Sequence, residues 1–98
     1  MSPINKKKLN ILRLKLDKLD NELLRLIKKR SNLVNDVLKV KIHKKEIIDQ
    51  KRISFILKEI KKKSIQLKID PKITDRICKN MIWSFIDYEK RNFRIKKK

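Results

Sequence analysis

One arginine interrupts a long apolar seam and could bind an anion there. From residue 9 to residue 40, aliphatic residues recur at alternating steps of three and four, the spacing that keeps one helix stripe against a partner helix. Of the ten seam positions, only Arg30 is charged. A guanidinium in such a seam is tolerated only when it is paired and hydrogen-bonded, so we expect Arg30 to meet an anionic group. The seam consists of Leu9, Leu12, Leu16, Leu19, Leu23, Leu26, Arg30, Leu33, Val37 and Val40.

A second cation is predicted on the same side of this helix. Lys41 follows Arg30 by eleven residues, or three turns, so the two side chains point the same way about 16 Å apart along the axis. Two long side chains could converge from there on a small dianion. Arg13 precedes Arg30 by seventeen residues, about 25 Å, which is too far to share the site within one chain. In an antiparallel dimer, Arg13 of a second copy could reach it.

Near the end of the chain an acidic residue shares a stripe with apolar ones. Cys78, Ile82, Phe85 and Glu89 follow one another at steps of four, three and four. A carboxylate in line with apolar residues is a further candidate for chemistry. On the neighbouring face of the same predicted helix lie Ile73, Ile77, Met81 and Ser84.

The elements that must hold these residues are three helices. We expect the first to run from a cap at Asn5, after a turn at Ser2-Pro3, to about residue 42, because it contains neither proline nor glycine. Residues 43–48 form a short connection. Asp49 then caps a second helix that ends between residues 63 and 68, with Ile53, Ile56, Ile60 and Leu67 on its buried stripe. Asp70-Pro71 marks the start of a third helix, which runs to about Phe93.

Composition supports an all-α protein that forms a dimer. The 98 residues make one domain, residues 1–98, with no glycine and 40% apolar content. A first helix of about 55 Å overhangs a core of about 35 Å, so a second copy is expected to cover it. The single Cys78 cannot form an intrachain disulfide, and no apolar run approaches a membrane span. Residues 1–8 lack the apolar segment of a secretory signal, so we expect a cytoplasmic protein with no membrane partner.

The net charge of +19 raises the alternative of a non-catalytic basic module that binds nucleic acid. Against that alternative, lysines are spread over every predicted helix, and only five aromatic residues occur, with no base-stacking pattern among the basic residues. We therefore favour a small-molecule site over a nucleic-acid partner. The lone His43 has no cysteine or second histidine nearby, and we expect neither a metal nor another cofactor.

A series of short motifs follows in order across residues 9–90. They are Leu9 to Arg13, Leu16-Asp17-Lys18-Leu19-Asp20, Leu23 to Arg30, Val37 to Lys41, Asp49 to Arg52, and Ile69-Asp70-Pro71. Each motif is weak alone, but their order and spacing together resemble the all-helical chorismate mutase family. This resemblance implies an intertwined homodimer of three-helix chains with two active sites, in which the long first helix crosses between subunits. It also implies chorismate as the small-molecule substrate and its rearrangement to prephenate as the reaction.

The resemblance further implies a role for each matching residue. Arg30 and Arg52 would bind the two carboxylates of chorismate, with Arg13 contributed by the second copy. Lys41 would hydrogen-bond the ether oxygen, and Asp49 would lie near the ring hydroxyl. Glu89 falls where the family has Gln or Glu donating to the same ether oxygen, which a carboxyl group can do only when it is protonated.

Two positions depart from the family pattern. The residue after Arg52 is usually Glu but is Ile53 here, and a usual Ser four residues before Glu89 is Phe85. Both changes resemble the isochorismate pyruvate lyase branch, which shares the fold and forms salicylate. Lyase activity on isochorismate is therefore the alternative, and mutase activity ranks first because aromatic amino-acid synthesis is the commoner need.

Purely structural interpretations of the candidates also remain open. Arg30 could extend its long stem from the seam into solvent. Glu89 could pair with a nearby basic residue on the surface. Asp49 and Arg52 could be an ordinary pair at a helix start.

Overall fold

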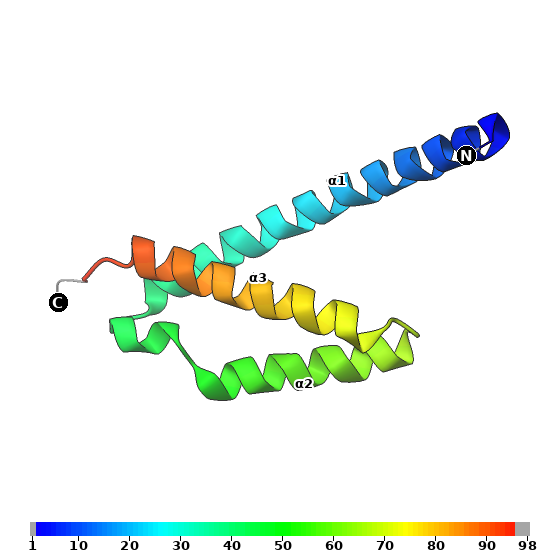
Figure 1. Ribbon diagram of the computed structural model, residues 1–98. Helices are drawn as coiled ribbons and strands as arrows, with labels where there is room; N and C mark the ends of the chain where they lie inside the picture. Colours follow the sequence, from blue (N-terminus) through cyan, green and yellow to red (C-terminus); the bar gives the residue numbers. More distant parts are fainter. Residues whose placement is uncertain (1, 96–98) are drawn as a thin grey trace. The chain divides into compact units, whose positions relative to one another are not determined.

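The computed structural model describes residues 2–95, and these residues form an all-helical structure (Figure 1). The three α-helices are α1 (Pro3–Val40), α2 (Gln50–Gln66) and α3 (Pro71–Asn92). A single 3₁₀ turn, η1 (Lys44–Ile47), lies between α1 and α2. The predicted all-α class with three helices and a long first helix is thus confirmed.

Contacts divide the chain into two units, Met1–Leu33 and Val34–Lys98. The first unit is the greater part of α1, which is a helix without a core of its own. Its seam residues Leu12, Leu16, Leu19, Leu23 and Leu26 are each 52–60% exposed. The second unit contains the end of α1 together with η1, α2 and α3. That residues 1–98 form one domain stays a prediction.

The start of α1 differs from the expected one. The backbone N–H of Asn5 donates to the Ser2 hydroxyl at 3.2 Å, and that of Lys6 donates to the Ser2 carbonyl at 2.9 Å. Ser2 is therefore the cap and Pro3 the first helical residue, a position in which the missing N–H of proline does no harm. The prediction that Asn5 caps the helix was wrong.

The start of α2 follows the expected capping chemistry. The Asp49 carboxylate accepts the backbone N–H of Arg52 at 3.0 Å, and its carbonyl accepts that of Ile53 at 2.9 Å. The first bond satisfies one of the N–H groups that a helix start leaves without an intrahelical partner, and the second is the first i→i−4 bond of the helix. The prediction that Asp49 caps the second helix is confirmed.

The connection from α2 to α3 uses a left-handed residue that is not glycine. Lys68 has a φ of 58°. Its N–H group donates to the Ile65 carbonyl at 3.1 Å, and the N–H group of Ile69 donates to the Ser64 carbonyl at 2.9 Å. This is the Schellman pattern, in which glycine is the usual left-handed residue. Asp70 then caps α3 by accepting the N–H of Lys72 at 3.0 Å, so α3 begins where predicted.

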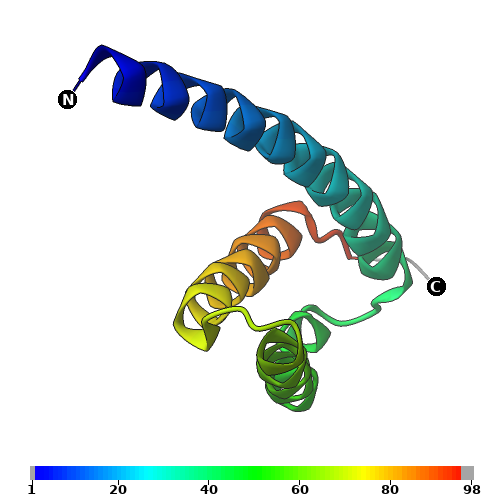
Figure 2. The same ribbon diagram turned by 90° about the vertical axis from the view of Figure 1, so that its right-hand side faces the viewer.

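The core of the second unit is small and lies where the end of α1, η1 and α3 meet. Its buried residues are Leu38, Ile47, Ile82 and Ile86, and half-buried residues of α2 pack against them. Helices α2 and α3 lie side by side in both views (Figures 1 and 2). At their connected ends the buried Ser64 hydroxyl lies 2.7 Å from that of Thr74 and joins the two helices. This packing sets the position of the last turns of α3 relative to Lys41, the residue that follows α1.

Within residues 2–95, no helix combines the length and the apolar character that crossing a bilayer requires.

Candidate functional site

A lysine and a glutamate from distant parts of the sequence meet in the second unit. Lys41 Nζ donates to Glu89 Oε1 at 3.0 Å. Leu38, three residues before Lys41, packs in the core with Ile86, which lies three residues before Glu89. Because both side chains are placed by the same core contacts, the fold itself brings them together. We call these two residues the Lys41–Glu89 pair.

The pair is shielded from water. The Glu89 side chain is 7% exposed and that of Lys41 is 18% exposed. A carboxylate this buried needs a cation or several hydrogen bonds to offset its lost hydration. The other three ion pairs among residues 2–95 join residues three or four apart on a helix surface, with side chains at least 50% exposed. The alternative that Glu89 is an ordinary surface ion-pair residue is therefore wrong.

This arrangement can stabilise negative charge on a ligand oxygen. An ammonium group carries three N–H donors, so Lys41 can bridge Glu89 and a ligand oxygen in one arrangement. In a site with little water, such a donor acts more strongly than it does in solution. The Glu89 carboxylate accepts a hydrogen bond from this ammonium group in the pair.

At the start of α2, the predicted site residues Asp49 and Arg52 contact each other through the backbone. The Asp49 carboxylate acts as the helix cap, and within residues 2–95 it forms no ion pair with the Arg52 guanidinium. The guanidinium lies over the ring of Phe55 instead, with its Cζ 5.6 Å from the ring centroid. Both Asp49 and Arg52 are exposed. Sequence reasoning missed Phe55, although the spacing of three residues on a helix could have indicated the contact.

The two positions that depart from the family pattern are both half-buried. Ile53 packs against the core of the second unit, and its side chain offers no hydrogen-bonding group. Phe85 lies on α3 one turn before Glu89. Ile53 therefore lies on the same helix as Arg52, and Phe85 lies on the same helix as Glu89.

The remaining candidates lie on α1 in the first unit. Arg13 is exposed and Arg30 is half-buried. Every residue from 10 to 29 is exposed, so the partial burial of Arg30 distinguishes it from the long stretch of α1 that precedes it. The roles of Arg13, Arg30, Asp49, Arg52, Ile53 and Phe85 toward a ligand stay predictions.

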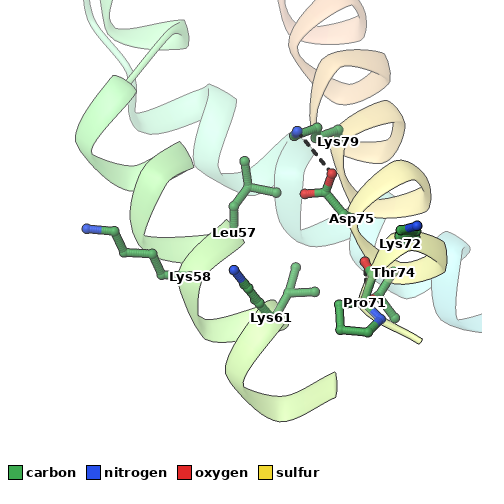
Figure 3. A pocket seen from close by; sticks show the side chains of 9 residues that line it. Leu57, Lys58, Lys61, Pro71, Lys72, Thr74, Asp75 and Lys79 are labelled. Atoms are coloured by element: carbon green, nitrogen blue, oxygen red, sulfur yellow. Dashed lines mark hydrogen bonds and ion pairs between the residues drawn. The ribbon is translucent and has the colours of Figure 1, made fainter. Parts of the chain in front are cut away.

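A separate groove runs between α2 and α3 near their connection (Figure 3). Leu57 and Pro71 contribute apolar surface, and Lys58 and Lys61 extend along its α2 side. None of the predicted site residues lines this groove. The groove is therefore distinct from the Lys41–Glu89 pair.

Fold and side-chain chemistry together define a small all-helical protein with a buried cation–carboxylate pair. Residues 12–90 match the family model described as chorismate mutase type II. Since the match covers most of its length, the chain belongs to the chorismate mutase type II family. Comparisons with curated proteins and with solved structures found no match. The resemblance inferred from the motifs is thus confirmed at the level of the family.

Proposed function

We propose that this protein is a chorismate mutase that converts chorismate to prephenate. The observation that carries the proposal is the Lys41–Glu89 pair, a half-buried donor and a buried carboxyl group at 3.0 Å in a chain of this family. The reaction is pericyclic and needs no nucleophile. Catalysis then consists of folding the enolpyruvyl arm over the ring and stabilising charge on the ether oxygen.

In this mechanism the ether oxygen lies against the Lys41–Glu89 pair. As its C–O bond breaks and the new C–C bond forms, negative charge builds on that oxygen. The Lys41 ammonium donates to it throughout, and protonated Glu89 supplies a second donor. Preorganised donors of this kind require no reorganisation during the reaction, which is the basis of their effect on the barrier.

The two carboxylates of the substrate are held by arginines. Guanidinium groups bind carboxylates through two parallel hydrogen bonds, which fixes orientation as well as position. Arg30 and Arg52 take this role, together with Arg13 of a second copy. Asp49 lies toward the ring hydroxyl. The exposure of Arg52 and Asp49 at the start of α2 agrees with a place at the mouth of a site.

A homodimer accompanies this proposal. The apolar seam of α1 remains more than half exposed at Leu12, Leu16, Leu19, Leu23 and Leu26. A continuous apolar stripe of this length on a helix is typical of a surface covered by a partner. A second copy, related by antiparallel packing of the two α1 helices, would cover the seam and supply Arg13.

The second candidate function is an isochorismate pyruvate lyase, which forms salicylate and pyruvate. The observation that favours it is Ile53, a half-buried residue without a polar group where mutases of the family usually have Glu. Isochorismate carries its hydroxyl at another ring position, so it would not need that Glu.

One experiment distinguishes these functions. Purified protein is incubated separately with chorismate and with isochorismate, and the products are resolved by chromatography. Prephenate from chorismate would support the mutase, and salicylate with pyruvate from isochorismate would support the lyase. Turnover of neither substrate, together with salt-sensitive binding of DNA or RNA, would replace both with the basic-module function.

A further inference from the structure

We infer that Phe55 is a positioning residue that holds the Arg52 guanidinium ready for a substrate carboxylate, an inference that rests on the proposed function. Arg52 lies in the first turn of α2, and Phe55 follows it by three residues on the same side of the helix. The Arg52 Cζ is 5.6 Å from the centroid of the Phe55 ring. No role in binding or catalysis was expected for Phe55 from the sequence motifs.

The type of contact matters because it leaves the hydrogen-bonding edge of the guanidinium available. A cation over an aromatic ring is attracted through its face, whereas a carboxylate partner would occupy the N–H groups in the guanidinium plane. Within residues 2–95, Arg52 forms no ion pair with a carboxylate. Phe55 thus restricts the side chain without competing with an anionic ligand.

The exposure of both residues supports a functional reason for the contact. Phe55 is 54% exposed, although a phenylalanine ring gains most from full burial. Arginine side chains lose considerable conformational entropy when they are ordered, and a ring that orders Arg52 beforehand reduces the loss on binding. Loss of the contact should therefore weaken substrate binding more than it slows the chemical step.

Steady-state turnover of chorismate by single and double variants tests this role. We expect Phe55→Leu to raise KM about two- to five-fold, as for an exposed cation–π contact, with kcat within two-fold of wild type. Phe55→Tyr retains a ring and should restore the wild-type KM. In an Arg52→Ala background, Phe55→Leu should have no further effect, because the residue through which Phe55 acts is gone. Ser54→Ala, an adjacent exposed change, serves as the matched control.

An unchanged KM in Phe55→Leu, or an equal rise in the Arg52→Ala background, would overturn the inference. A measurement without substrate tests the contact of Phe55 with Arg52 directly. The Arg52 Nε–H resonance in ¹⁵N NMR spectra should shift between wild type and Phe55→Leu, because the ring current of Phe55 is lost. If wild-type protein turned over no chorismate, the proposed function and this positioning role would both fail, whatever the NMR spectra showed. If it did turn over chorismate but neither KM nor the resonance responded to Phe55→Leu, the positioning role alone would fail.

Discussion

Lys41 and Glu89 lie 48 positions apart in the sequence, yet their side chains meet at 3.0 Å with little exposure to water. Lys41 comes directly after the last residue of α1, and Glu89 lies in the last turns of α3. The core contacts of Leu38 and Ile86 place them. Their position thus depends on the packing of the second unit and would be lost if that unit unfolded.

The first prediction concerns the hydrogen-bonding role of Glu89. Glu89→Gln keeps a side chain that can accept from Lys41 and donate to the ether oxygen, whereas Glu89→Leu can do neither. The kcat for chorismate should therefore fall about 10²-fold in Glu89→Leu and stay much closer to wild type in Glu89→Gln. Steady-state assays of chorismate consumption measure both values. A folded Glu89→Leu protein with wild-type kcat would remove Glu89 from the mechanism.

Arg30 is expected to act in substrate binding. Arg30→Ala removes a charge-assisted hydrogen bond to a carboxylate, worth about 1.5–3 kcal/mol, so KM should rise roughly 10- to 150-fold. Arg25→Ala on the same helix is the matched control, because Arg25 is fully outside the seam and exposed. Equal KM values for the two variants would show that Arg30 has only a structural role.

The exposed seam of α1 yields a prediction about oligomeric state. Leu19→Glu places a charge at a seam position that is 58% exposed in the single chain. If a second copy covers the seam, the charge would be desolvated and the dimer should dissociate. Sedimentation velocity should then show a monomer for Leu19→Glu and a dimer for Asn21→Glu, which lies off the seam. A wild-type protein that sediments as a monomer would contradict the proposed dimer.

Backbone strain at Lys68 predicts a stabilising substitution. Lys68→Gly should raise the free energy of unfolding by about 1 kcal/mol, because a residue with a Cβ is disfavoured at a φ of 58°. Lys62→Gly, in the interior of α2, should lower it by about the same amount. Urea titrations followed by circular dichroism give both values. A destabilised Lys68→Gly would mean that the lysine side chain makes a compensating contact.

Two of the three helix starts, those of α2 and α3, were predictable from their capping residues. Asp49 and Asp70 accept backbone N–H groups as expected, because aspartate is a typical cap residue and the sequence after each one favours a helix. The start of α1 was misassigned because Ser2-Pro3 was interpreted as a turn before the helix. A serine cap followed by proline in the first helical position is equally a helix start.

Which stripe of α3 faces the core could not be predicted from periodicity. The stripe with Ile82 and Glu89 is buried, whereas Ile73 and Ile77 on the neighbouring face are more than half exposed. Both stripes are apolar at helical spacing, so the choice depends on where α2 and the end of α1 pack. Leu67 was expected on the buried stripe of α2 but is 71% exposed, because the helix ends one residue earlier.

Among the candidate site residues, the spacing of Lys41 from Arg30 and the position of Glu89 in an apolar stripe indicated these two residues separately. Their contact depends on the core cluster that contains Leu38 and Ile86, which no local pattern encodes. The cation–π contact of Arg52 with Phe55 is local, but a spacing of three residues on a helix does not by itself distinguish such a contact from two independent exposed side chains.

The central claim, that the Lys41–Glu89 pair forms the catalytic centre, is tested most directly by comparing Lys41→Ala with Lys39→Ala. Lys39 is a neighbouring lysine whose side chain is 70% exposed and pairs with Asp36 at 3.9 Å. The kcat/KM for chorismate should fall about 10²- to 10³-fold in Lys41→Ala, the loss typical of one preorganised donor, and stay within two-fold of wild type in Lys39→Ala. Circular dichroism confirms that each variant is folded before it is assayed. A folded Lys41→Ala protein with wild-type kcat/KM would contradict the account.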